Sequence, residues 1–242
     1  MKKTMYIICV FLVLLFITAC NGAKILATPS SSQSSSPTEP EINREICTAY
    51  LDVLCGNQEF YEVISEQALD ISCIGKAFTS DDLPIIVQQL AIIDLDYDYV
   101  PELVLKLAFN EDGGSQIGTI VLRYQNGQVY GYALEYRSFL DLKEDGTFMY
   151  SSGAADWGFG NITFSPNGYI INEISYCKSD RYADGTYLSE YVVDGAQATE
   201  QDFFEEVNLQ DSKVNVFWLD FIDSENKNIE EKLNEAISST VE

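Results

Sequence analysis

Residues 89–109 read QLAIIDLDYDYVPELVLKLAF, two apolar runs separated by a short acidic segment. The runs at 89–94 and 102–109 have the length of β-strands and are rich in isoleucine, leucine and valine. Aspartates alternate with larger residues between them, and Pro101 directly precedes the second run. This stretch predicts a strand, a polar loop and a second strand.

The same strand-and-turn pattern continues for about a hundred residues beyond this stretch. Turn pairs in which Asn or Asp precedes Gly recur at 126–127, 145–146, 167–168, 184–185 and 194–195. Such pairs favour tight connections between antiparallel strands. Strands are expected near 89–94, 102–109, 117–124, 128–135, 147–152, 159–164, 169–177 and 186–193. Together they predict an antiparallel β meander forming one sheet.

Helical patterns flank the predicted meander on both sides. Apolar residues repeat at helical spacing over 42–54, and Gly56 follows where a left-handed cap would end a helix. A second short helix is expected around 59–68. Thr199 is placed to cap a helix ending before Lys213, and the apolar spacing near the C-terminus predicts a final helix. The predicted class is α+β, with an N-terminal helix, an antiparallel meander and C-terminal helices packed on the sheet, in one domain over 41–242.

The N-terminus has the features of an export signal. Lys2 and Lys3 precede the run MYIICVFLVLLFITA at 5–19, and small residues and a cysteine follow its apolar core. A membrane-spanning helix needs about 20 apolar residues, so a span is disfavoured. Residues 1–19 are therefore expected to be a cleaved signal peptide.

The sequence Ile17-Thr18-Ala19-Cys20 resembles the bacterial lipobox. The resemblance implies a lipid on the Cys20 thiol after cleavage before it. Residues 20–40, rich in serine and proline, predict a flexible tether. The expected location is the extracytoplasmic face of a cell membrane, held there through the lipid; a secretory peptide that ends in these four residues by chance is the alternative.

Composition excludes several common function classes. The formal net charge is −24, which opposes binding to nucleic acid because phosphate contacts depend on Lys and Arg. The chain contains no histidine, so the usual zinc, Ser/His and Cys/His sites are disfavoured. Four cysteines remain in the predicted domain, at positions 47, 55, 73 and 177. They permit three pairings or free thiols, and the sequence does not choose between them.

One segment has the spacing of a metal-binding loop. Asp94, Asp96, Asp98 and Glu102 stand at loop positions one, three, five and nine, with the Val100 carbonyl at seven. This arrangement can wrap oxygen ligands around calcium. The other interpretation is a strand-to-strand turn whose charges face water.

The chain resembles a group of uncharacterised Firmicutes cell-surface lipoproteins in which a strand leads into a DxDGDGxPEL segment similar to the calcium loops of FG-GAP repeats. The resemblance rests on the lipobox and on residues 94–103. It implies a calcium loop, but Tyr97 and Tyr99 stand where glycines are usual. Glycine makes the sharp turn of such a loop without strain, so both interpretations of the loop stay open.

A second candidate site is the segment SSGAADWGFGN at 151–161. Trp157 and Phe159 could anchor a glycan or a protein in a recognition loop. The alternative is a turn between strands whose two rings fold into the core.

These features predict a non-catalytic, membrane-anchored binding or envelope-interaction module with an unknown protein or glycan partner. The alternative is an envelope or glycan hydrolase that uses a carboxylate pair, a chemistry that needs no histidine. The spacing of acidic residues identifies no such pair.

Overall fold

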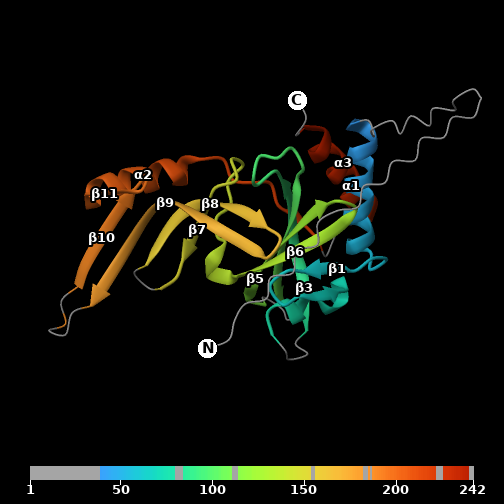
Figure 1. Ribbon diagram of the computed structural model, residues 1–242, viewed down its shortest axis with the longest axis horizontal. Coiled ribbons are helices and arrows are strands. Elements are labelled where there is room, and N and C mark those ends of the chain that lie inside the picture. Colours follow the sequence, from blue (N-terminus) through green and yellow to red (C-terminus); the bar gives the residue numbers. More distant parts are fainter. Residues whose placement is uncertain are drawn as a thin grey trace, which may run out of the picture. The chain divides into compact units, whose positions relative to one another are not determined.

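The chain forms two β-sheets with helices packed against them (Figure 1). The computed structural model describes residues 39–79, 84–110, 114–153, 156–181, 185, 187–221 and 226–239. The predicted signal peptide and Cys20 lie outside the described residues, as does nearly all of the predicted tether. Residues Pro37–Glu242 group together as one structural unit.

The first sheet has seven strands in the order β12-β3-β4-β5-β6-β1-β2. Its strands are β1 (Phe60–Glu62), β2 (Gln67–Leu69), β3 (Ile85–Ile93), β4 (Glu102–Phe109), β5 (Gln116–Gln125), β6 (Gln128–Glu135) and β12 (Leu219–Asp220). The second sheet has five strands in the order β11-β10-β9-β8-β7. Its strands are β7 (Phe148–Ser151), β8 (Trp157–Ser165), β9 (Gly168–Arg181), β10 (Tyr187–Val193) and β11 (Ala196–Ala198). The β1–β6 pair is parallel, whereas the consecutive strands of both meanders pair antiparallel.

The predicted α+β class is confirmed, but the expectation of one sheet is wrong. The chain leaves the first sheet after β6, passes through the short 3-10 helix η2 (Tyr136–Ser138) and starts a second sheet at β7. Alternation along a strand reports which faces are buried, not which neighbour the strand pairs with. The sequence pattern therefore located the eight strands β3 to β10, missed the short strands β1, β2, β11 and β12, and missed the division between the sheets.

The short helix predicted around 59–68 is also wrong, because this segment forms the β1–β2 hairpin. Phe60 and Glu62 are both fully buried. The Glu62 carboxylate accepts N–H groups from Ile64, Ser65 and Ala133 at 3.2, 2.5 and 3.2 Å. These bonds tie the turn to β6 and favour the hairpin over a helical turn.

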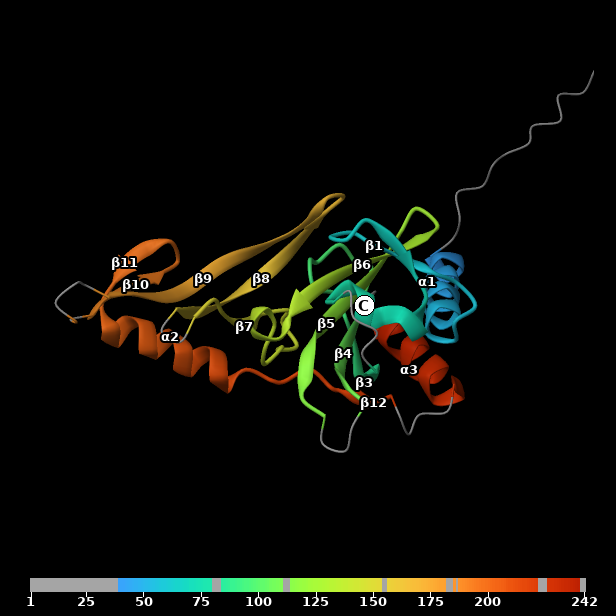
Figure 2. The same cartoon turned by 90° about the horizontal axis from the view of Figure 1, so that it is seen from below.

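Helices α1 (Glu39–Leu54) and α3 (Asn226–Ser239) contact one another and belong to the core of the first sheet (Figures 1 and 2). Tyr50 and Val53 of α1 are fully buried, and so is Leu233 of α3. Gly56 has a φ of 69° and its N–H donates to the Val53 carbonyl, which ends α1 as the sequence suggested.

The hydroxyl of Tyr50 links the end of the acidic loop to β5. It donates to the Pro101 carbonyl at 2.9 Å and accepts the Tyr124 N–H at 3.0 Å. Burial raises the pKa of this hydroxyl well above its usual range, so it stays protonated and can donate. One helix side chain thus holds the start of β4 against β5.

The two sheets share a second core that lies beside the acidic loop. Leu95 of the acidic loop and Val104 of β4 pack in the same cluster as Phe148 and Phe164 of the second sheet. The rings of Tyr132 and Phe164 are 4.7 Å apart between their centroids. The loop between β3 and β4 therefore sits next to the junction of the sheets.

Helix α2 (Glu200–Ser212) follows β11 and packs on β9 and β10 (Figure 2). Thr199 caps it as predicted, since the Thr199 hydroxyl accepts the Asp202 N–H and the Asp202 carboxylate accepts the Thr199 N–H. This reciprocal pair stabilises the first turn. The buried residues of α2 include Phe203 and Val207.

Two further observations bear on the sequence predictions. The four cysteines at 47, 55, 73 and 177 are all free thiols. Among the described residues, no helix is both long enough and apolar enough to cross a membrane.

Candidate functional site

The acidic loop joins β3 to β4 and has an unusual backbone. Tyr97 and Tyr99 have φ angles of 60° and 67°, in the left-handed region. A residue with a Cβ in this conformation costs about 1 kcal/mol or more. The strained positions are those where the resemblance to calcium loops expects glycine. The loop therefore makes the turns of a calcium loop with tyrosine at both positions, although glycine would make them without strain.

Carboxylates within the loop bond to its own backbone. Asp94 accepts the N–H groups of Asp98 and Tyr99 at 3.2 and 3.0 Å. Asp98 accepts the Val100 N–H at 2.8 Å. These bonds satisfy the amides that the two left-handed residues turn inward.

Glu102, the first residue of β4, is fully buried under the loop. Its Oε2 accepts the Leu95 N–H at 2.8 Å. Burial raises the pKa of Glu102 well above its ordinary value of 4.5, and the charge of Asp96 raises it further. Burial also raises the pKa of Asp96, although Arg123 opposes this shift.

Arg123 of β5 is the cation at the centre of these carboxylates. The register pairs Leu103 with Leu122, which brings Arg123 beside Glu102. Its Nη2 lies 3.0 Å from an Asp96 oxygen and also bonds to Asp98. Its Nε lies 3.5 Å from Oε1 of Glu102, an ion pair without hydrogen-bond geometry.

The electrostatic environment of Arg123 is strongly negative. Burial alone would lower the pKa of the guanidinium, but Asp96 and Glu102 raise it, and the net shift is upward. The guanidinium also lies over the ring of Phe164, 5.4 Å from its centroid. Arg123 is therefore held charged between the loop and the second sheet.

The expected calcium ligands are only partly brought together. Carboxylate oxygens of Asp94, Asp96 and Glu102 lie within 4.8 Å of one another. Asp98 instead bonds to Arg123, and Asp96 contacts the same guanidinium. A divalent ion among these oxygens would meet a fixed positive charge at close range. The donor set does not fit calcium while Arg123 keeps this position.

The loop is also fixed to the turn before β7. The Tyr97 hydroxyl donates to the Asp145 carbonyl. Gly146 has a φ of 71°, and a Cβ there would lie 3.3 Å from the Leu95 carbonyl oxygen. The left-handed φ and the close approach together favour glycine at this position, and the acidic loop and the turn form one packed unit.

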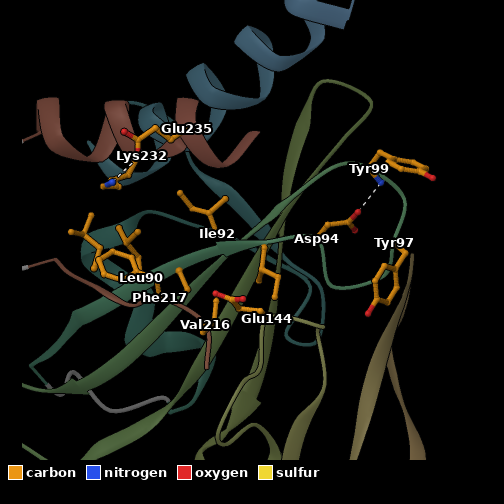
Figure 3. Close-up of a pocket in the computed structure, with 13 residues that line it drawn as sticks. Leu90, Ile92, Asp94, Tyr97, Tyr99, Glu144, Val216, Phe217, Lys232 and Glu235 are labelled. Carbon is orange, nitrogen blue, oxygen red and sulfur yellow. Dashed lines mark hydrogen bonds and ion pairs between the residues drawn. The ribbon is translucent and has the colours of Figure 1, made fainter. Parts of the chain in front are cut away.

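A groove of about 750 Å³ opens beside the loop (Figure 3). Tyr97 and Tyr99 line one end of it and are 62% and 74% exposed. Apolar side chains of β3 and of the segment before β12 line its middle, among them Ile92 and Phe217. Lys232 and Glu235 of α3, which pair at 2.5 Å, line the other end. Asp94, beside Tyr99, and Glu144 add further carboxylates to the lining.

The second candidate site takes a different form from the predicted recognition loop. Phe159 is 3% exposed and belongs to a core cluster with Phe203. Its burial argues against the anchor role, because a ligand could reach the ring only after local rearrangement. Trp157 packs edge-on against Phe203 at 5.0 Å and borders a small hollow of about 230 Å³.

Arg123 is the functional residue that sequence reasoning missed. A single arginine in the apolar strand QIGTIVLRYQ is the signal that could have identified it, because a buried cation needs an acidic partner.

Comparisons with known proteins add no family to this description. No protein-family model matches the chain, and neither a curated protein nor a solved structure matches it.

Proposed function

We propose that this protein is a non-catalytic binding module, anchored by a lipid on Cys20 to the extracytoplasmic face of a membrane, and that the groove beside the acidic loop binds its ligand. The ligand is a protein or a cell-wall glycan. In this proposal helices α1 and α2 support the two sheets, whereas α3 also contributes Lys232 and Glu235 to the groove.

The observation that carries the proposal is the pair of exposed, strained tyrosines. Tyr97 and Tyr99 adopt left-handed backbone angles and are still largely exposed at the groove. Glycine would relieve the strain, so stability alone does not account for tyrosine at both positions. Strain held at a ligand-accessible surface is typical of binding sites, and tyrosine gives a large contact area with few rotatable bonds.

We further propose that Arg123 replaces calcium as the cation of the loop. The guanidinium contacts Asp96, Asp98 and Glu102, which supports the interpretation of the loop as a metal-independent turn. Its function is to hold the two tyrosines in place.

The hydrolase alternative has less support. Such an enzyme needs a carboxylic acid and a carboxylate facing one another across a ligand. Asp94 lines the groove, but its two oxygens accept the N–H groups of Asp98 and Tyr99. Glu102, whose raised pKa would suit an acid, is fully buried.

Two experiments test the proposed function. Intact-mass analysis of protein from the native membrane should find the leader removed and an acyl-bearing Cys20, and Cys20→Ser should release the protein from the membrane. An unmodified position 20 would contradict the proposed anchor.

Ligand binding is tested with the Tyr97→Ala/Tyr99→Ala double variant. Immobilised wild type, the double variant and Tyr136→Ala are each exposed to solubilised envelope proteins and to purified cell-wall glycan fragments. Tyr136 is a suitable control because it is 46% exposed on η2, outside the groove lining. Retention should fall at least about tenfold in the double variant alone, as when anchor residues are removed. Equal retention by all three proteins would contradict the groove as the binding site.

A further inference from the structure

The groove runs along the edge of a strand. It is lined by the consecutive residues 90–94 of β3 and the start of the loop. Successive residues of a strand point to opposite faces of the sheet, so a hollow on one face would contact only alternate residues. A groove lined by all five lies against the backbone edge.

This edge is paired for only part of its length. On one side β3 pairs with β4 from Ile85 to Ile93. On the other side the two-residue strand β12 pairs Leu219 with Leu90 and Asp220 with Gln89. Within the described part of the chain, no strand pairs with residues 91–93 on that side.

The chain before β12 turns away from β3 instead of extending the pairing. The Val216 N–H donates to the Leu142 carbonyl at 3.1 Å, and Asn215 forms a bridge with Lys143. The departing segment makes the second wall of the groove. A wedge is left in which another strand would continue the sheet.

The groove walls indicate the chemistry of that strand. Ile92 and Phe217 offer apolar contacts, and Phe217 is 68% exposed. Asp94, Glu144 and Glu235 supply negative charge, and Lys232 is the cation among the groove-lining residues. Lys232 pairs with Glu235 at 2.5 Å, which leaves the lining net acidic. An acidic, partly apolar wall complements basic and apolar side chains.

We propose that the groove binds an extended peptide segment with alternating basic and apolar side chains, which adds as a strand to the β3 edge at residues 91–93. This inference rests on the proposed binding function of the groove and specifies its ligand. Main-chain hydrogen bonds to the edge supply affinity, while the acidic wall and the tyrosines select the side chains. Three residues of edge span about 10 Å, so a short peptide suffices.

The test uses a blocked six-residue peptide of alternating lysine and valine and measures amide hydrogen exchange by NMR in the tether-plus-domain protein. Saturating peptide should slow exchange at those amides of residues 91–93 that face the groove by about tenfold or more. The opposite edge of the same sheet, β2, is the internal control and should not change. The Glu144→Lys variant should weaken peptide binding about tenfold, because one attraction becomes a repulsion.

Two further peptides separate strand addition from other modes of binding. The same peptide with an N-methyl group on every residue lacks backbone donors and should not bind; equal binding would overturn strand addition. A peptide with glutamate in place of lysine should also fail, and its binding would overturn the charge assignment. Slow exchange at 91–93 that depends on protein concentration without peptide would assign the edge to a second copy of the chain instead.

Failure of this inference is distinguishable from failure of the proposed function. If glycan fragments or envelope proteins need Tyr97 and Tyr99 for binding but leave exchange at 91–93 unchanged, the peptide proposal is wrong and the binding function stands. If no probe depends on the tyrosines, both are wrong.

Discussion

Arg123 and Glu102 face one another at the base of the acidic loop, with Nε and Oε1 3.5 Å apart and neither atom hydrogen-bonded. Glu102 is fully buried and the Arg123 side chain is 13% exposed. A buried ion pair of this kind contributes little net stability when intact, but removing one partner leaves an uncompensated charge. The carboxylates of the loop therefore depend on Arg123 for compensation of their charge.

Replacement of Arg123 should destabilise the protein strongly. Arg123→Gln leaves Asp96, Asp98 and Glu102 without their cation, and we expect a loss of about 3 kcal/mol in the free energy of unfolding. Urea denaturation measures this loss. Arg137→Gln is the matched control, because Arg137 is exposed on η2 and should change stability by no more than about 0.5 kcal/mol. Equal effects of the two substitutions would contradict the assigned role.

Glycine at position 99 should stabilise the fold and weaken ligand binding. Tyr99 is 74% exposed with a φ of 67°, so Tyr99→Gly relieves backbone strain worth about 0.5 to 1 kcal/mol. Tyr99→Ala removes the ring and retains the Cβ, and it should not gain this stability. Thermal melts of the three proteins separate the contribution of the ring from that of the backbone. A glycine variant less stable than the alanine variant would argue against strain.

Stability should depend on pH through Glu102. Its folded-state pKa is raised above 4.5 by burial, so the folded protein retains a proton that the unfolded chain releases. The free energy of unfolding should fall as pH rises through the window above 4.5, with a slope of at most about 1.4 kcal/mol per pH unit for one proton.

Glu102→Gln removes this titration. Its stability relative to wild type should increase as pH rises through that window, measured by denaturant unfolding at a series of pH values. A constant difference between the two proteins would show that Glu102 has the same pKa in both states.

The hydroxyl of Tyr50 should contribute more to the free energy of unfolding than the hydroxyl of an exposed tyrosine. Tyr50→Phe leaves the Pro101 carbonyl and the Tyr124 N–H without this partner, and the loss should be about 1 to 3 kcal/mol. Tyr136→Phe, at an exposed position, is the control and should be near neutral. Denaturation midpoints of the two variants provide the comparison.

Local pattern was sufficient to predict the longer strands, β3 to β10, but neither the shortest strands nor the assembly of the sheets. The runs at 89–94 and 102–109 fall on β3 and β4 because their apolar residues face cores on both sides of the sheet. The hairpin at 60–69 was misread because two strands of three residues are too short to show a period. The second sheet depends on where the chain goes after Glu135, which strand composition does not encode.

Of the candidate site, only the acidic loop could be predicted from the sequence. The spacing of Asp94, Asp96, Asp98 and Glu102 located it, and Tyr97 and Tyr99 do adopt glycine-like angles. Arg123 could not be assigned to the loop without the register of β4 against β5, which shifts at Leu107 and Ala108. The groove could not be predicted from the sequence either, because its lining combines residues of β3, the segment before β12 and α3.

The most direct measurement is the melting temperature of the wild-type protein in excess calcium and in excess chelator. If Arg123 is the cation of the loop, the two melting curves should coincide, since a ligand that does not bind the folded state cannot stabilise it. A higher melting temperature in calcium than in chelator would show that a metal ion completes the loop and would contradict the account.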